Sequence, residues 1–463
     1  MNNILEIIET RLHQEWIMGC HSHYFYQLIQ NYIEQLTQLK KLTNNPRIIL
    51  VETHEDYHHF LAAFLATVIT NCHVFLGDKR WKEREWEEVC NLVNPHLILG
   101  IDLNYTIKSN QNNFPLPNKS LIMISTGGTS GKIRFSIHTW HTLSASVKGF
   151  THFFHLDKVN SFCILPLHHV SGLMQFMRSF LTQGKIIIYP YSKLKKNILP
   201  SFNFEDFFIS LVPTQLQLLL TLNPKFLQQF KTILLGGAPP WNSLLTEARN
   251  YQLNLSPTYG MTETASQIVT LKPEDFKQGN NSTGKVLPHA DIKINEDKII
   301  KIKAESLYFG YYPHYEPQPY LITDDLGYFD HKNDLHILGR NSQKIITGGE
   351  NVFPKEVETI ILETNLVKDI AIIGIADEQW GEAITAIYVP QNNTVDVTLI
   401  QETIKKQLSP VKQPKHWIRV KQLPRNQQGK LNYQTLQKIA TTYPKQENYL
   451  SKNQGSKTPS FRR

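Results

Sequence analysis

The chain has 463 residues, more than a single hydrophobic core usually organises, so its length predicts two or more domains. Hydrophobic residues make up 41% and charged residues 19%, which is typical of folded globular proteins and excludes a largely disordered chain. The longest apolar run, Ile370–Ala376, is too short to span a bilayer, and residues 1–10 lack the pattern of a secretory signal. We therefore expect a cytoplasmic protein without a membrane span.

The net charge of +8 raises the question of a nucleic-acid or membrane partner. Much of this charge lies in the C-terminal segment, which contains Lys445, Lys452, Lys457, Arg462 and Arg463 against the single acidic Glu447. Because no aromatic platform for stacking bases accompanies it, we interpret residues 441–463 as a disordered, solvated basic tail and expect no nucleic-acid partner. The four cysteines show no paired spacing, which predicts buried free thiols in a reducing compartment.

Short apolar runs alternate with helical patterns through the first two thirds of the chain. The predicted strands are 47–51, 72–76, 96–101, 121–125, 162–167, 185–189, 207–212 and 232–235, and the predicted helices are 58–69, 81–92 and 213–222. Strands that alternate with helices imply parallel sheets covered on both faces, so the pattern predicts an α/β fold.

The pattern changes after about Gly284, where residues 291–294 and 298–303 read as a hairpin. The last hundred or so residues read as a compact α+β unit, with helices 355–363 and 397–408 and strands 369–375, 383–389 and 417–423. We expect a large N-terminal domain (1–342) of parallel-rich sheets flanked by helices, and a small mobile C-terminal α+β domain (343–440).

A glycine-rich segment, Ser125–Arg134, directly follows a predicted strand. Its three glycines permit close backbone approach to a phosphate, while its hydroxyls and the basic Lys132 and Arg134 add donors and charge. It is not a Walker loop, which needs glycine at Thr126 and Ser or Thr at Ile133, and a dinucleotide fingerprint also needs glycine at Thr126. From this segment alone, a flexible polar turn stays open as the alternative.

The segment resembles the Thr-Ser-Gly-Ser/Thr-Thr-Gly-x-Pro-Lys signature of the adenylate-forming superfamily, which includes acyl-CoA synthetases, luciferases and peptide-synthetase adenylation domains. The residues that fit are Thr126, Gly128, Thr129, Ser130 and Gly131. Gly127 replaces a usual Ser and Ile133 a usual Pro. Arg134 stands in place of the usual Lys, and its larger guanidinium fork still supplies positive charge to pyrophosphate. The resemblance implies that these residues grip ATP.

Two further segments resemble nucleotide motifs of the same superfamily, in the expected order. Thr258–Glu263 is similar to Tyr-Gly-x-Thr-Glu, which implies that Tyr259 packs on adenine, Thr262 contacts phosphate and Glu263 holds Mg²⁺. Thr323–Gly327 is similar to Thr-Gly-Asp-x-Gly, which implies that Asp325 binds the ribose hydroxyls. An Asp-rich turn stays open for this second segment, because Asp324 adds another carboxylate. Gly236 and Gly237 are further candidate nucleotide-binding residues.

The C-terminal stretch carries two more resemblances. Leu338–Val352 is similar to the hinge and following loop, which implies that Arg340 reaches the ribose and that Gly348 and Gly349 line the coenzyme A path. Gln343 stands where the superfamily normally has Asp at the hinge. Leu423–Lys430 is similar to the loop with the catalytic lysine, so Lys430 is expected to stabilise the transition state of adenylate formation.

The segment Leu165–Leu173, Leu-Pro-Leu-His-His-Val-Ser-Gly-Leu, bears on the choice of acid. It resembles Leu-Pro-Leu-Phe-His-Val-Ser-Gly followed by Arg in o-succinylbenzoate–CoA ligases. The resemblance implies that His169 and Ser171 line the acyl pocket and that Arg178 binds the second carboxylate. A surface ion pair is the alternative for Arg178. We do not expect His168 and His169 to bind a metal, because adjacent side chains should diverge and no third ligand is evident.

Together these motifs predict ATP-dependent ligation of 2-succinylbenzoate, an aromatic dicarboxylate, to coenzyme A through an acyl-adenylate, in menaquinone or phylloquinone synthesis. ATP, Mg²⁺ and coenzyme A are the expected cofactors and co-substrates. The alternatives are another aryl- or acyl-CoA ligase and a nucleotide-binding relative without turnover, the latter suggested by Arg134, Asp324 and Gln343. Homo-oligomerisation stays open.

Overall fold

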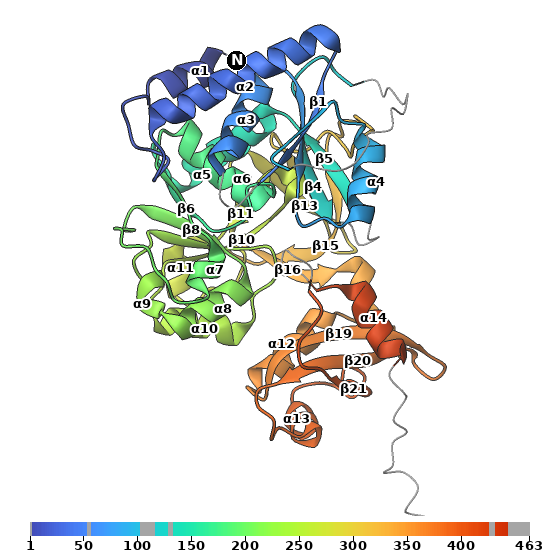
Figure 1. The fold of residues 1–463 in the computed structure, drawn as a ribbon. Coiled ribbons are helices and arrows are strands. Elements are labelled where there is room, and N and C mark those ends of the chain that lie inside the picture. The colour runs from blue at the N-terminus through green and yellow to red at the C-terminus, as the bar shows by residue number, and fades with distance from the viewer. Residues whose placement is uncertain (1, 53–56, 102–115, 128–132, 426–430, 443–463) are drawn as a thin grey trace, which may run out of the picture. The chain divides into compact units, whose positions relative to one another are not determined.

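The computed structural model describes residues 2–52, 57–101, 116–127, 133–425 and 431–442. The chain divides into two compact units, Met1–Asn341 and Ser342–Arg463 (Figure 1). The predicted basic tail lies outside the described residues from residue 443 onward.

The first sheet of unit 1 forms from buried apolar runs in the order β3-β1-β2-β4-β5. Its strands are β3 (Leu97–Leu99), β1 (Arg47–Val51), β2 (His73–Gly77), β4 (Ile122–Gly127) and β5 (Ile133–His138). All neighbours pair in parallel except β4 and β5, which form an antiparallel pair. Because strand side chains alternate between faces, Ile48 and Leu50 pack with helices α2 and α3, whereas Ile49 and Val51 pack with α4.

The second sheet has the order β12-β11-β10-β9-β8-β6-β7 and is parallel from β7 to β10. Its strands are β12 (Lys285–Val286), β11 (Ser266–Thr270), β10 (Leu255–Met261), β9 (Thr232–Leu235), β8 (Phe207–Leu211), β6 (Asn160–Cys163) and β7 (Ile186–Ile188). Helices α3, α5 and α6 share one apolar core with residues of both sheets, so they form a layer between them. Helices α8, α9 and α10 cover the other face of the second sheet.

A third, antiparallel sheet completes unit 1, in the order β13-β14-β15-β16. Its strands are β13 (Ala290–Ile294), β14 (Ile299–Ala304), β15 (Leu321–Phe329) and β16 (Leu335–Arg340). Its apolar face packs on β11 and contacts Tyr259 and Met261 of β10, so it brings β15 and β16 to the end of the second sheet.

The helices of unit 1 are amphipathic or fully buried, as their positions require. They are α1 (Asn2–Glu9), α2 (Ser22–Leu42), α3 (Tyr57–Ile69), α4 (Glu83–Val93), α5 (Trp140–Phe154), α6 (Val170–Leu181), α7 (Tyr191–Leu194), α8 (Pro213–Leu222), α9 (Pro224–Leu227), α10 (Asn242–Asn250), α11 (Pro273–Lys277) and the 3₁₀ turn η1 (Thr262–Thr264). Another 3₁₀ turn, η2 (Asn341–Gln343), spans the boundary between the units. None of the helices in the described part of the chain is long and apolar enough to cross a membrane.

Unit 2 is an α+β unit around the mixed sheet β18-β17-β20-β19, with β21 paired to β20. Its strands are β17 (Ile345–Thr347), β18 (Glu350–Val352), β19 (Val367–Asp377), β20 (Gly381–Pro390) and β21 (His416–Arg419). Its helices are α12 (Pro354–Glu363), α13 (Val397–Ile404) and α14 (Tyr433–Thr442). Helices α12 and α13 share one apolar core with the sheet, and α14 belongs to a second cluster.

The α/β class and the two-part division into a larger and a smaller α/β part agree with the expected fold. Some predicted extents are wrong: β21 ends at Arg419 and not at residue 423, and α13 ends at Ile404 and not at residue 408. Strand β6 likewise ends at Cys163 and not at residue 167. The chain turns there: Pro166 cannot donate to a sheet, and the Leu167 amide donates to the Glu52 carboxylate. The four cysteines are free and buried, as predicted.

Gly184 gives a test of the tight turn between α6 and β7. A Cβ at this position would overlap the carbonyl oxygen of Val159, which belongs to the backbone and cannot rotate away. We predict that Gly184→Ala costs about 2 kcal/mol or more and lowers the Tm measured by calorimetry.

Gly279 serves as the matched control, since a Cβ there meets no atom within 4 Å and only its φ of +98° disfavours alanine. Gly279→Ala should therefore cost only about 1 kcal/mol. Equal Tm values for the two variants would contradict the close packing at Gly184.

Candidate active site

The motif residue Tyr259 lies on β10 and points to Asp325 on β15. Its hydroxyl donates a hydrogen bond to Asp325 Oδ2 at 2.8 Å, and Arg340 Nε lies 3.4 Å from Asp325 Oδ1. The antiparallel register pairs Asp325 directly with Arg340. Burial and the neighbouring Asp325 carboxylate raise the pKa of Tyr259 well above its usual value, so the phenol stays protonated as a donor. Residues from two other motifs, Tyr259 and Arg340, thus converge on the Asp325 carboxylate.

The two neighbouring aspartates of this motif are distinguished by the strand. Thr323–Gly327 belongs to β15, so the alternative of an Asp-rich turn is wrong. Asp324 is exposed on the strand, whereas Asp325 is partly buried and makes the contacts with Tyr259 and Arg340. The backbone amide of Asp325 is also held by Thr323 Oγ1 at 3.1 Å.

Glu263 lies in η1 and is held by a residue that the sequence did not single out. The Tyr311 hydroxyl donates to Glu263 Oε1 at 2.5 Å, and the Arg134 guanidinium lies over the Tyr311 ring at 5.2 Å from its centroid. Glu263 makes no salt bridge among the residues that the structure describes. A partly exposed carboxylate without a basic partner fits a hard cation such as Mg²⁺.

The glycine-rich segment is described only at its two ends. Strands β4 and β5 pair antiparallel, with Thr126 opposite Arg134 and Gly127 opposite Ile133. The predicted phosphate ligands Gly128, Thr129, Ser130 and Gly131 lie outside the described residues, as does Lys430. The hairpin register therefore places the start and the end of the segment together. Arg134 at its end contacts the Tyr311 ring, and Tyr311 in turn contacts Glu263.

Two neighbouring positions complete this region. Gly236 directly follows β9, and a Cβ there would lie 2.6 Å from Thr258 Oγ1, so glycine permits close packing on the Tyr259 motif. Gly237 adopts a φ of +78°, which favours glycine. The buried His138 holds the carbonyl oxygen of Thr262 at 2.8 Å, and burial lowers the pKa of His138 to about 4.

Arg178 of α6 is a buried cation, so the alternative of a surface ion pair is wrong. Only 3% of its surface is exposed, and its Nη2 donates to Ser266 Oγ at 3.1 Å and Gln267 Oε1 at 3.2 Å. Its guanidinium lies over Phe150 at 4.4 Å, and no carboxylate forms a salt bridge with it among the described residues. Burial lowers the pKa of Arg178 to about 10, so it remains charged at neutral pH.

His169 and Ser171 lie at the start of α6. His169 is the N-cap residue and is half-buried, whereas Ser171 is exposed. The expectation that the side chains of His168 and His169 diverge is wrong, because their ring centroids are 4.3 Å apart. Asp78 supplies a third donor, and one ligand atom from each of the three lies within 4.8 Å of the others.

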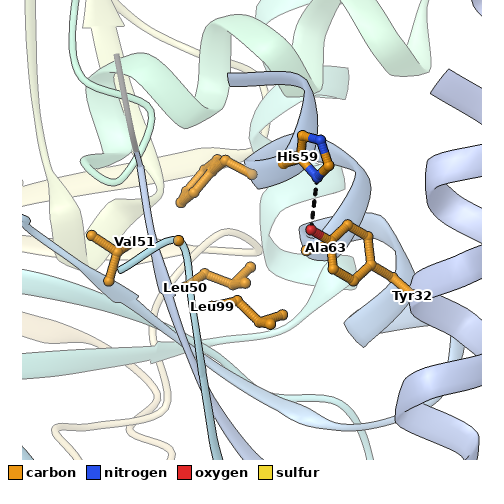
Figure 2. A pocket seen from close by; sticks show the side chains of 8 residues that line it. Tyr32, Leu50, Val51, His59, Ala63 and Leu99 are labelled. Atoms are coloured by element: carbon orange, nitrogen blue, oxygen red, sulfur yellow. Dashed lines mark hydrogen bonds between the residues drawn. The ribbon is translucent and has the colours of Figure 1, made fainter. Parts of the chain in front are cut away.

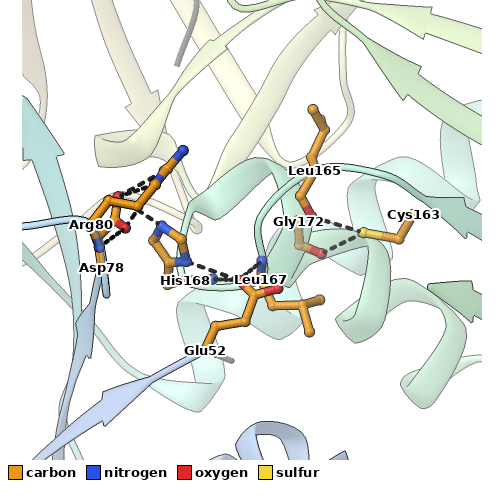
Figure 3. Close-up of polar contacts among 8 residues, drawn as sticks. All are labelled: Glu52, Asp78, Arg80, Cys163, Leu165, Leu167, His168 and Gly172. Atoms are coloured by element: carbon orange, nitrogen blue, oxygen red, sulfur yellow. Dashed lines mark hydrogen bonds and ion pairs between the residues drawn. The ribbon is translucent and has the colours of Figure 1, made fainter. Parts of the chain in front are cut away.

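Asp78 and Glu52 belong to a polar network around His168 that the motifs did not predict (Figure 3). Arg80 binds the Asp78 carboxylate with Nε at 2.9 Å and Nη2 at 2.7 Å. A guanidinium already bound to a ligand carboxylate opposes a second cation there, so the cluster fits a proton on His168 better than a metal. A signal for both acids was present in the sequence, since Glu52 directly follows the predicted strand 47–51 and Asp78 lies two residues after the predicted strand 72–76.

A separate cavity of about 230 Å³ lies between α2, α3, β1 and β3 (Figure 2). It is lined by Tyr32, Leu50, Val51, His59, Phe60, Ala63, Leu99 and Gly100. Its polar contact is the hydrogen bond of 2.9 Å between Tyr32 Oη and His59 Nδ1. None of the predicted site residues lines it.

In unit 2, the candidate coenzyme A residues lie between β17 and β18. Gly348 and Gly349 adopt φ angles of +56° and +81°, which favour glycine. The loop that ends at Lys430 is flanked by the bridge between Arg425 and Leu431, and Arg425 binds both carboxylate oxygens of Asp369 at 2.7 and 2.9 Å.

The sequence profile of the AMP-binding enzyme family matches residues 45–302, and that of its C-terminal domain matches residues 356–430. The chain belongs to the AMP-binding enzyme family. A 2–succinylbenzoate–CoA ligase of Listeria monocytogenes is 34% identical over 66% of this chain and 67% of the relative. The ligase of that name from Bacillus subtilis is 29% identical over 77% of this chain and 76% of the relative.

Solved structures show the same fold. An o-succinylbenzoate–CoA synthetase of Bacillus subtilis, in complex with ATP and magnesium, superposes with a TM-score of 0.77 at 23% identity. The alignment covers 94% of this chain and 98% of that structure. A second structure of that synthetase, with the acyl-adenylate OSB-AMP, has a TM-score of 0.76 over 93% of this chain and 97% of the other.

The contacts of Asp325 generate a prediction for nucleotide binding. We expect Asp325→Asn to raise the KM for ATP by about tenfold or more, because it removes a charged acceptor from the site. Asp324→Asn is the matched control: the same isosteric change on the adjacent, exposed residue should leave the KM for ATP within about twofold. Steady-state kinetics measure both, and a larger effect at Asp324 would contradict the assignment.

Proposed function

We propose that the chain is a 2-succinylbenzoate–CoA ligase, which makes the thioester through an acyl-adenylate in menaquinone or phylloquinone synthesis. The observation that carries this choice of acid is the buried guanidinium of Arg178, which pairs with no carboxylate of the described residues. A dianionic acid brings the carboxylate that this cation lacks, whereas a fatty acid or simple benzoate has only the carboxylate that reacts. The relatives named for the same activity support the proposal.

In the first half-reaction, a carboxylate oxygen of the succinyl arm attacks the α-phosphorus of ATP. An oxygen–phosphorus bond forms, and the bond to pyrophosphate breaks. Asp325 and Arg340 hold the ribose, Tyr259 lies against adenine, and Thr262, Arg134 and the glycine-rich segment contact the phosphates. Glu263 would hold Mg²⁺, which neutralises charge on the phosphates when bound. Lys430 stabilises the charge that develops at the α-phosphate.

In the second half-reaction, the sulfur of coenzyme A attacks the acyl carbon of the mixed anhydride. A carbon–sulfur bond forms, and the bond to AMP breaks. The small C-terminal domain carries Gly348 and Gly349, which lie beside the pantetheine chain; a Cβ at Gly349 would meet no described atom within 4 Å. His169 and Ser171 line the acyl pocket, and Arg178 binds the aromatic carboxylate in both halves.

The reaction proposed here fits a cytoplasmic enzyme. The four cysteines are free and buried, which is typical of proteins in reducing compartments. The substrates ATP and coenzyme A are intracellular metabolites, and the product is a small-molecule thioester.

The direct test is AMP release with Mg–ATP, coenzyme A and a panel of acids. We expect turnover with 2-succinylbenzoate and little with benzoate or a fatty acid. Turnover with those monocarboxylates and none with 2-succinylbenzoate would replace the proposal by another acyl-CoA ligase. If no acid in the panel supports AMP release, the chain is a nucleotide-binding relative without turnover.

Arg178 can be tested with two acids that differ by one group. We predict that Arg178→Met lowers kcat/KM for 2-succinylbenzoate by about 100-fold. For 3-benzoylpropionate, which lacks the aromatic carboxylate, kcat/KM should fall by less than about threefold. The reason is that methionine fills the space and cannot pair with the second carboxylate.

Arg11→Met is the matched control for burial. Arg11 is also buried, but its guanidinium donates to the carbonyl oxygens of Ser179 and Gly184. This variant should lose stability and keep the ratio of kcat/KM for the two acids. An equal loss for both acids in Arg178→Met would argue against the carboxylate contact.

Lys430 separates the two half-reactions. Lys430→Ala should slow adenylate formation, measured by pyrophosphate exchange, by about 100-fold or more. Thioester formation from supplied acyl-adenylate should stay within about threefold of wild type, because the lysine acts at the α-phosphate and not at the thiol. Equal losses in both assays would refute this division of roles.

A further inference from the structure

The turn before α6 ends between two carboxylates that the sheet register places side by side. Parallel pairing of β1 with β2 sets Val51 opposite Gly77, so the next residues, Glu52 and Asp78, are neighbours at the ends of the two strands. Both are buried, at 6% and 3% exposure. Two buried carboxylates at adjacent strand ends repel each other unless cations lie beside them.

His168 lies between these carboxylates (Figure 3). Its Nδ1 donates to Glu52 Oε2 at 2.8 Å, and its Nε2 lies 3.3 Å from Asp78 Oδ2. Glu52 Oε2 also accepts from the backbone amides of Leu167 at 2.7 Å and His168 at 3.4 Å. With Arg80, whose side chain is partly exposed, also bound to Asp78, two acids and two bases form one group of balanced charge around the buried His168.

The same turn carries the residues assigned to the acyl pocket. His169 packs against the His168 ring and caps α6, while its carbonyl oxygen accepts from Gly172 and Leu173. A Cβ on Gly172 would overlap the carbonyl oxygen of Pro166, so the backbone of the turn packs directly against the start of α6. A shift of His168 is therefore passed directly to His169 and Ser171.

We propose that the protonated His168, bridging Glu52 and Asp78, is an ionic tether that positions the acyl-pocket turn and thereby sets the affinity for the acid. His168 and Glu52 are positioning residues, since they act through His169 and Ser171. The inference rests on the proposed function for its kinetic readout. It goes beyond the motif resemblance, in which Phe stands at this position.

The groups that face His168 define how pH acts on the tether. They are Glu52 after β1, Asp78 and Arg80 after β2, and the adjacent His169. Burial lowers the pKa of His168, but its contacts with Asp78 and Glu52 outweigh burial and raise it. The positive charge of His168 is therefore present at low pH and is lost as pH rises through its raised pKa. Loss of the proton from Nε2 leaves a lone pair that faces the Asp78 carboxylate.

Two variants and one control test the tether in the full-length chain. Glu52→Gln keeps the shape and removes one charge, and His168→Phe installs the residue of the resembling motif. His73→Phe is the control, because His73 is a buried histidine on β2 whose ring nitrogens make no hydrogen bond to any described residue. Burial lowers the pKa of His73 to about 4, so this substitution removes a neutral ring.

The kinetic readout separates positioning from stability. We expect both variants to raise the KM for 2-succinylbenzoate about tenfold, with the KM for ATP and kcat within about twofold, and His73→Phe to change neither KM. The KM of the wild type should rise as pH increases through the raised pKa of His168, and that of His168→Phe should not follow it. Equal changes in both KM values, or none, would overturn the tether.

Hydrogen exchange gives a readout that does not need the proposed substrate. The amides of Leu167 and His168 should exchange faster in Glu52→Gln than in wild type, and unchanged exchange overturns the tether. If wild type turns over no 2-succinylbenzoate but the exchange changes as expected, the proposed function fails and the tether stands. Stoichiometric zinc in the purified wild type, lost in His168→Phe, would overturn the tether in favour of a metal centre.

Discussion

The buried guanidinium of Arg178, which is removed from water, is the constraint on which the proposed choice of acid depends. Arg178 is buried in α6, and its polar contacts among the described residues are with the neutral side chains of Ser266 and Gln267. The desolvation of such a charge is costly unless an anion approaches it. The fold maintains the cation by packing α6 between two sheets, with Phe150 of α5 against the guanidinium face. In the function proposed above, the second carboxylate of the acid is the anion that approaches this cation.

The remaining site follows from how three sheets meet. The parallel part of the second sheet ends at β10, which carries Tyr259. The third sheet pairs Asp325 with Arg340 in register and brings Asp325 to Tyr259. The first sheet ends at the glycine-rich segment, whose strand β5 carries Arg134 to Tyr311 and Glu263. The departure at Arg134 has a structural consequence here, because a guanidinium can stack flat on the tyrosine ring as well as supply charge.

The sequence predicted the elements of the α/β core well wherever the pattern was local. Helix 213–222 and strands 47–51 and 232–235 match the observed bounds, since apolar periodicity and a proline at the helix start define them. The strand predicted at 162–167 extends beyond the observed β6, because the apolar run continues through Leu165 and Leu167. The backbone already turns toward Glu52 at these residues. Periodicity does not show a carboxylate that lies more than a hundred residues away.

The site residues divide in the same way. Motif resemblance named Tyr259, Asp325 and Arg340, and the structure brings them together. It could not name Tyr311, whose contact with Glu263 depends on a bridge between Tyr311 and Ser136 that has no sequence signature. Glu52 and Asp78 were within reach of prediction, because parallel strands of known order place their following residues at one edge.

The most direct test of the account is a crystal structure of the full chain with a stable sulfamoyl analogue of the 2-succinylbenzoyl adenylate. We predict that the aromatic carboxylate binds the Arg178 guanidinium and that the ribose hydroxyls bind Asp325. An analogue bound with its ribose on Asp325 but its aromatic carboxylate away from Arg178 would contradict the central claim that the buried cation selects the acid.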